Sequence, residues 1–96
     1  MDRSFSKYRI KREIERGLSA EAKYDDTKLL LEVGINGKQY EIRFTEKYPF
    51  LAPAVVCDGE YMNLRMLWPE VWKATYTINN IIQALTTEEP VTEDLH

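Results

Sequence analysis

The stretch KYPFLAPAVVCDGEYMNLRMLWPEVW, residues 47–72, carries most of the information about the fold of this chain. It contains three prolines, three Phe or Trp residues and the only cysteine, Cys57. The pairs Tyr48-Pro49 and Ala52-Pro53 exclude helix and keep the backbone extended, so the chain is expected to turn a corner here. Large aromatic side chains can fill the space beneath such a corner. The stretch is therefore either a catalytic loop around Cys57 or a corner without a nucleophile.

A β-hairpin is predicted before this corner. In KLLLEVGINGKQYEIRF, residues 28–44, Asn36-Gly37 separates two runs of alternating apolar residues and supplies the two positive-φ positions of a type I′ turn. The polar segment SAEAKYDD, residues 19–26, is a weaker candidate for an added edge strand, and AVVC, residues 54–57, for a short strand after the corner. The residues expected on the buried face of the hairpin are Leu29, Leu31, Val33, Ile35, Tyr40, Ile42 and Phe44.

A helix is predicted at residues 4–17, SFSKYRIKREIERG. Ser4 or Ser6 can cap its N-terminus, and Gly17 can end it. The helix has an apolar stripe on one side, and the face opposite this stripe is almost wholly cationic. A cationic helix face is either exposed to solvent or a docking surface for a partner. The residues expected to form the apolar stripe are Phe5, Tyr8, Ile10 and Ile14.

A second helix is predicted after Trp72. Thr77 is a good N-cap residue, and an apolar stripe with helical spacing follows it, made of Ile78, Ile81, Ile82 and Leu85. Together these elements predict one α+β domain over residues 1–90, with an N-terminal helix, an antiparallel meander of about three or four strands, a proline-aromatic loop and a helix packed on the sheet. Residues 91–96 are expected to form a loosely ordered acidic tail.

Composition narrows the classes of function. The chain has 96 residues, enough for one hydrophobic core. Its first 17 residues hold six Lys or Arg and three Asp or Glu, whereas the remainder holds seven and thirteen. This distribution argues against general nucleic-acid binding and favours a protein partner that is acidic where it meets the N-terminal segment.

The remaining composition predicts no cofactor and no membrane segment. One cysteine and one histidine, His96, are too few for a disulfide, a metal cluster or a Cys/His dyad. No apolar run has membrane-spanning length, and the basic N-terminus lacks the apolar core of a signal peptide. We therefore expect a cytoplasmic and/or nuclear protein.

These motifs, in this order, resemble the ubiquitin-conjugating enzyme (UBC-like) fold, including its inactive variants and the related RWD domains. Tyr48-Pro49-Phe50, followed by Pro53 and two valines, is similar to the family's Y-P-F-x-P-P-x-V junction between strands, with Ala52 in place of the first proline of the pair. Trp72 followed by Thr77-Ile78 is similar to the family's tryptophan, short loop and T-I helix start. The resemblance implies a truncated domain of this fold.

The resemblance also implies that the catalytic residues are missing. Active members carry their cysteine in an I-C-L-x-x-L-like segment shortly before the tryptophan and after a His-Pro-Asn. The matching segment here, residues 62–67, has Asn63 at the position of the nucleophile, and the chain has no His-Pro-Asn. A carboxamide cannot hold a thioester, so a pseudoenzyme is expected. Cys57 is expected to be a small buried hydrophobic residue, and a displaced nucleophile is the alternative.

A domain of this kind that lacks catalytic residues is expected to function through the surfaces that bind its partners. Family members meet activating enzymes and ligases through the first helix, the Phe of Y-P-F and the loop after the tryptophan, where Lys73-Ala74 here replaces a usual Ser-Pro. The predicted function is a non-catalytic binding module for a ubiquitin-pathway protein (ubiquitin, a conjugating enzyme or a ligase), alone or as a subunit of a complex. The residues matching the family's binding surfaces are Arg9, Lys11, Arg12, Arg16, Phe50, Lys73 and Ala74.

Two other functions remain open from the sequence. One is a minimal carrier of ubiquitin or a ubiquitin-like protein on Cys57, which requires an exposed and activated thiol. The other is an RWD-like interaction module with no link to ubiquitin.

Overall fold

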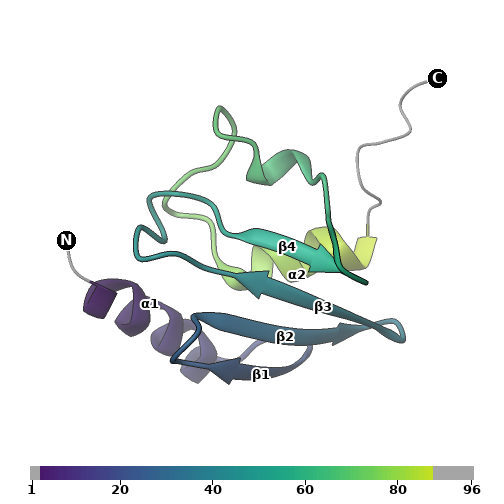
Figure 1. The fold of residues 1–96 in the computed structure, drawn as a ribbon, viewed down its shortest axis with the longest axis horizontal. Helices are drawn as coiled ribbons and strands as arrows, with labels where there is room; N and C mark the ends of the chain where they lie inside the picture. Colours follow the sequence, from purple (N-terminus) through teal and green to yellow (C-terminus); the bar gives the residue numbers. More distant parts are fainter. Residues whose placement is uncertain (1–2, 88–96) are drawn as a thin grey trace.

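An antiparallel sheet of five strands forms the frame of the protein, and two helices lie behind it (Figure 1). The computed structural model describes residues 3–87. The α+β class, with a helix at each end of the described chain, is as predicted. The elements in chain order are α1 (Arg3–Arg16), β1 (Glu21–Asp25), β2 (Leu30–Ile35), β3 (Lys38–Arg43), β4 (Ala54–Cys57), β5 (Glu60–Tyr61), a 3₁₀ turn η1 (Arg65–Leu67) and α2 (Ile78–Thr87).

The sheet is a simple meander, in which neighbours along the chain are neighbours in the sheet. The predicted hairpin is confirmed: Asn36 and Gly37 have φ of 50° and 82°, and Ile35 pairs with Lys38 across the turn. The weak edge-strand candidate also forms a strand, β1, which pairs antiparallel with β2.

One strand more than predicted completes the sheet. Asp58 and Gly59 form a second tight turn, with φ of 54° and 80°, so the chain reverses after β4. Tyr61 then pairs with Val56 in the two-residue strand β5. The sequence did not predict this strand because two residues are too few to show a periodic pattern.

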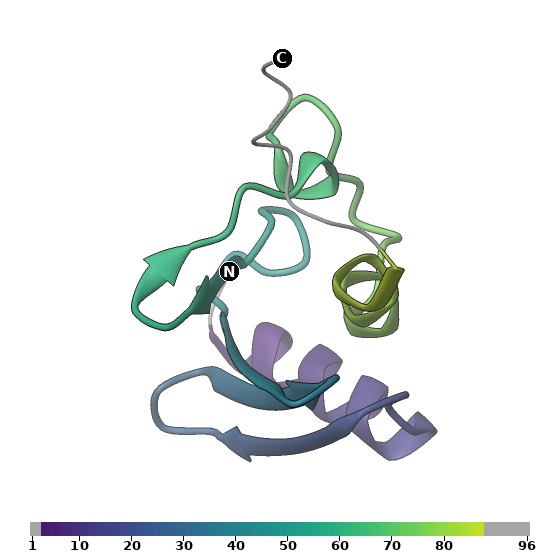
Figure 2. The same cartoon turned by 90° about the vertical axis from the view of Figure 1, so that its right-hand side faces the viewer.

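One hydrophobic core lies between the sheet and the helices, and Figure 2 shows both helices on the same side of the sheet. All seven residues predicted for the buried face of the hairpin are buried. The predicted stripe of α2 is buried as well, and Thr77 caps this helix: its Oγ1 accepts from the Asn80 amide at 3.2 Å, while its own amide donates to Asn80 Oδ1 at 2.8 Å.

The prediction for the buried face of α1 was wrong in part. Phe5 and Tyr8 are 40% and 58% exposed, and within residues 5–16 the fully or nearly fully buried side chains are Ser6, Ile10 and Glu13. Tyr8 and Ile10 are two positions apart, about 200° around a helix, so they cannot share a face. Two of the three buried positions are polar, and for that reason a hydrophobicity pattern does not find them.

The boundary between the predicted domain and the predicted tail, at residues 90 and 91, lies outside the described residues. Within residues 3–87 no helix is long and apolar enough to cross a membrane, and no group of three His, Cys, Asp or Glu side chains is placed to hold a metal ion.

Candidate protein-binding surface

Four exposed apolar side chains from α1 and the proline corner form a surface that we call the apolar strip: Phe5, Tyr8, Phe50 and Leu51. Phe5 and Phe50 stack, with ring centroids 5.8 Å apart and ring planes inclined by 16°. Phe50 and Leu51 are 57% and 53% exposed. If a large side chain offers about 200 Å² when fully exposed, the strip exposes roughly 400 Å², which is the size of an apolar patch that often serves binding.

The corner that carries Phe50 is closed by its own backbone. The Tyr48 amide donates to the Thr45 carbonyl at 3.1 Å, and the Phe50 and Leu51 amides donate to the Lys47 carbonyl at 2.7 and 3.1 Å. The Tyr48-Pro49 peptide bond is cis. Phe50 and Leu51 are both more than half exposed at this turn, so Phe50 is a surface residue rather than core.

A tryptophan ties this corner to the loop before α2. Trp72 Nε1 donates to the Pro49 carbonyl at 2.7 Å. The Trp72 ring lies edge-on to Tyr76 at 5.3 Å between centroids, and 6.3 Å from the Tyr48 ring. Lys73, the next residue, is exposed, and Ala74 is half-buried. The structure therefore brings the predicted residues Phe50, Lys73 and Ala74 to one end of the molecule.

A buried carboxylate, Glu13, lies beneath this surface. It is 7% exposed and accepts three hydrogen bonds, from Tyr48 Oη (2.7 Å), Arg9 Nε (2.6 Å) and the Ile78 amide (2.6 Å). Burial, followed by the nearby Glu13 charge, raises the pKa of Tyr48 well above its usual value, so the phenol remains a donor beyond the pH at which a tyrosine usually ionises. Sequence reasoning missed Glu13 because two of its three partners, Tyr48 and Ile78, lie 35 and 65 residues away along the chain.

The predicted binding residue Arg9 belongs to this buried network rather than to the open surface. Its Nη2 donates to the Ala74 carbonyl at 3.3 Å and to the Tyr76 carbonyl at 3.1 Å, in addition to the Glu13 pair. Its guanidinium also lies over the Tyr48 ring, 5.7 Å from the centroid. With these contacts made, Arg9 has little left to offer a partner.

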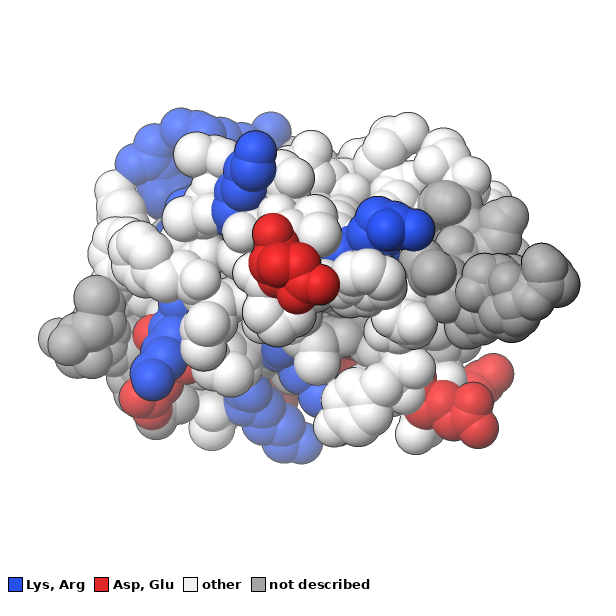
Figure 3. Space-filling view, turned by 90° about the horizontal axis from the view of Figure 1, so that it is seen from above, with Lys and Arg blue, Asp and Glu red and all other residues white. Residues whose placement is uncertain are grey.

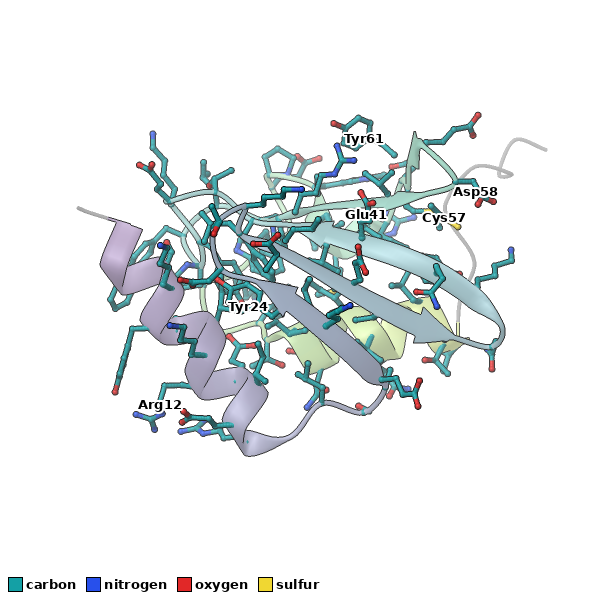
Figure 4. All side chains as sticks on the ribbon, turned by 60° about the horizontal axis from the view of Figure 1, so that its bottom comes forward. Arg12, Tyr24, Glu41, Cys57, Asp58 and Tyr61 are labelled. Atoms are coloured by element: carbon teal, nitrogen blue, oxygen red, sulfur yellow. The ribbon has the colours of Figure 1, made fainter. Side chains whose placement is uncertain are left out.

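The other predicted cations of α1 remain accessible. Arg12 projects from the outer side of the helix (Figure 4), where its Nη1 donates to Tyr8 Oη at 2.7 Å and its guanidinium lies over the Tyr8 ring. Arg16 is exposed one turn further. The helical part of the strip, Phe5 and Tyr8, lies on the same face of α1 as these two cations. Their spacing of three or four residues along the helix places all four side chains on that face.

Lys11 lies on a different flank of α1. It and Lys7 flank Asp26, at 3.9 and 3.4 Å between the ammonium nitrogens and the carboxylate. Burial acting alone would raise the pKa of Asp26, but Lys11 and then Lys7 lower it below its usual value. The charge of Lys11 is thus partly used within the molecule.

Asn63, which the sequence predicted to stand in place of a nucleophile, carries a carboxamide that an indole holds in position. Trp68 Nε1 donates to Asn63 Oδ1 at 2.9 Å, and the Arg65 guanidinium lies over the Trp68 ring, 4.9 Å from its centroid. Asn63 is exposed, and its group offers neither a thiolate nor a hydroxyl for covalent chemistry.

Cys57 is half-buried, where the sequence predicted a buried residue. It lies at the end of β4 that is remote from the corner, beside the Asp58 turn (Figure 4). Its side chain packs against the core, in register with Tyr40 of β3. The apolar strip and Cys57 are therefore at opposite ends of β4.

Two further surfaces are an open hollow beside the proline corner and the face of the sheet away from the helices. An open, mainly apolar hollow beside Leu51 is lined by Leu29, Thr45, Glu46 and Lys47. The sheet face away from the helices is polar, with Glu32, Glu41 and Arg43 in its centre. Viewed from above, uncharged atoms form most of the surface and charged groups are scattered over it (Figure 3).

Comparisons with protein-family models, with curated proteins and with solved structures find no significant match to this chain.

Proposed function

We propose that this chain is a non-catalytic domain of the UBC-like kind that binds a protein of the ubiquitin or ubiquitin-like pathway through the apolar strip. The observation that carries the proposal is the exposed stack of Phe50 on Phe5, at a corner fixed to the loop after Trp72. In the family that the sequence resembles, the equivalent corner, first helix and loop after the tryptophan are the surfaces that meet partners.

The size and charge of the surface support a protein partner. The strip offers roughly half of the ~800 Å² that each side of a standard interface buries, so the surrounding polar residues must contribute to the contact. Arg12 and Arg16 lie on the same helix face, where they would speed the approach of an acidic partner. In this arrangement Phe50 is the buried anchor and the cations orient the partner.

The absence of transfer chemistry is part of the proposal. Asn63 has no nucleophilic atom, and Cys57 lies half-buried at the far end of β4 from the strip. A domain of this kind acts by positioning one pathway protein relative to another. We place it in the cytoplasm or the nucleus, where this pathway operates.

Binding is tested by titrating the ¹⁵N-labelled protein with ubiquitin, with a panel of conjugating enzymes and with RING domains. We expect one of these to shift the amide signals of residues 5–12 and of Phe50 and Leu51. Phe50→Ala should weaken that complex roughly 5- to 150-fold, the equivalent of about 1–3 kcal/mol. Tyr61→Ala is the matched control, because Tyr61 is 69% exposed on the opposite face of the sheet.

Three outcomes would contradict the proposal. Binding that Tyr61→Ala abolishes and Phe50→Ala leaves intact would transfer the interface to the open sheet face. No binding to any pathway protein would favour the RWD-like alternative. A thioester formed with activating enzyme, ATP and ubiquitin, and lost in Cys57→Ser, would make the chain a carrier.

A further inference from the structure

We propose that Glu13 is a positioning residue: it holds the corner that bears Phe50 and the loop that follows Trp72 in fixed positions relative to α1. The purpose of this role rests on the proposed function, since these are the parts that form the binding surface. The role itself is a property of the described structure and can be tested without any partner.

The three donors to Glu13 come from three separate segments. Oε1 accepts from the Ile78 amide at the start of α2, and Oε2 accepts from Tyr48 Oη in the corner and from Arg9 Nε one turn earlier in α1. The sequence separations from Tyr48 and Ile78 are 35 and 65 residues. A single carboxylate thus connects every segment that contributes to the surface.

Arg9 extends the connection along the loop. Its Nη2 is bonded to the carbonyls of Ala74 and Tyr76, so the Glu13–Arg9 pair contacts the segment 74–78 at three points. This segment begins two residues after Trp72. Displacement of the pair would release the loop at its Ala74 end as well as at the start of α2.

Side chains outside the corner hold it at three carbonyl groups that precede Phe50. Ser6 Oγ lies 2.6 and 2.8 Å from the carbonyls of Glu46 and Tyr48, and Trp72 Nε1 donates to the Pro49 carbonyl. Of the side chains in the corner, Tyr48 is fully buried and reaches Glu13 through its hydroxyl. A change at Glu13 would therefore act on the residue two positions before Phe50, and through it on the stack with Phe5.

A role in stability alone does not account for this arrangement. Buried ion pairs are weak contributors to stability, because desolvation of the two charges offsets much of their attraction, and apolar replacements are often as stable. Three directional hydrogen bonds instead require one relative placement of the segments. The network is therefore better suited to fixing geometry than to adding stability.

The test is Glu13→Gln, with Glu32→Gln, an exposed carboxylate on the open sheet face, as the matched control. The amide oxygen of glutamine can still accept from Ile78, but its NH₂ group meets the Arg9 Nε donor and cannot accept from it. We expect changed signals for the Trp72 indole N–H and loss of the nuclear Overhauser contacts between the Phe5 and Phe50 rings. The amides of Leu31, Val33 and Ile42 in the sheet should keep their positions.

Unchanged Trp72 and Phe5–Phe50 signals in Glu13→Gln would overturn the proposal, as would equal changes over the whole spectrum, which indicate a structural role only. If Glu13→Gln does not fold, Tyr48→Phe decides the matter, because it removes one hydrogen bond and keeps the Arg9 pair. Changes confined to the corner and the Trp72 loop would then support the proposal, and no change would overturn it.

The titration described above separates the two proposals. Changed Trp72 signals in Glu13→Gln, with no pathway protein bound by the wild type, would leave the positioning role and remove the proposed function. Wild-type binding that Glu13→Gln weakens by at least 5-fold supports both. Equal binding by both proteins, despite changed signals, would show that positioning by Glu13 does not serve this interface.

Discussion

Phe5 of α1 and Phe50 of the proline corner stack at 5.8 Å, although 45 residues of sequence separate them and both rings are open to solvent. Aromatic pairs in a soluble protein are expected beneath the surface, where their burial contributes to stability. Here the two stacked rings form an apolar surface on the outside of the molecule, and polar groups beneath them hold the corner and α1 in place.

The stack should contribute little to folding. We expect Phe5→Ala and Phe50→Ala each to lower the free energy of unfolding by about 1 kcal/mol or less, and the double-mutant cycle in urea to give a coupling of about 0.5–1 kcal/mol. A loss of about 3 kcal/mol or more, the usual cost of truncating a core Phe, would instead show that Phe50 belongs to the core.

Arg9 and Arg12 should separate stability from binding. Arg9→Ala leaves Glu13 buried without its cation and should cost about 3 kcal/mol in urea unfolding. Arg12→Ala removes an exposed side chain and should stay within about 0.5 kcal/mol of the wild type. In binding measurements Arg12→Ala should slow association at low salt. If Arg9→Ala proves as stable as Arg12→Ala, the Arg9–Glu13 pair contributes little to the free energy of unfolding, and this prediction is wrong.

Stability should fall in strong alkali. Burial is the main cause that raises the pKa of Tyr24 and Tyr48 above the usual 10. A nearby carboxylate is the second cause: Asp26 for Tyr24 and Glu13 for Tyr48. Below pH 10 both the folded and unfolded chains hold these protons, so the full stability is present. Above pH 10 the unfolded chain ionises first, and stability is lost as the pH rises toward the folded pKa.

Absorbance near 295 nm can follow this ionisation. Tyr24 and Tyr48 should ionise only above the usual tyrosine pKa of 10, together with unfolding. Tyr48→Phe should make the stability less dependent on pH in this range. Ionisation of Tyr48 near pH 10 in a protein that stays folded would contradict its burial.

Acid should weaken the attachment of α1 to the β1–β2 turn. The pKa of Asp26 is lowered by Lys11 and then Lys7, which outweigh the opposite effect of burial. The folded pKa is thus below the unfolded value, so this contribution is present above about pH 4 and is lost as the pH falls through the folded pKa. Carboxyl NMR titration should show Lys11→Met raising the pKa of Asp26; no change would exclude Lys11 as the cause.

The thiol of Cys57 should react slowly in the folded protein. Its half-buried position predicts labelling by a small thiol reagent at a rate below that in denaturant, yet without global unfolding. The rate is measured by absorbance on mixing with the reagent in the presence and absence of urea. Labelling as fast as in the denatured chain would favour the carrier alternative and lead to assays with activating enzyme.

The sequence by itself determined the elements that obey local rules. Asn36-Gly37 specifies its turn through the positive φ of both residues, and Thr77 specifies the start of α2 through its own hydroxyl. Alternation along β2 and β3 and the helical spacing of Ile78, Ile81, Ile82 and Leu85 identified the buried faces. In each case the physical cause lies within a few residues, so the pattern is visible in the chain.

Only the tertiary structure decided which face of α1 is buried and which residues reach the surface. Glu13 is buried because donors 35 and 65 residues away satisfy its carboxylate, and Arg9 is withdrawn from the surface by the same network. Phe50 is exposed because Tyr48, two residues earlier, takes the interior position. A buried polar group needs partners supplied by the fold, and no local pattern in the sequence records where those partners will be.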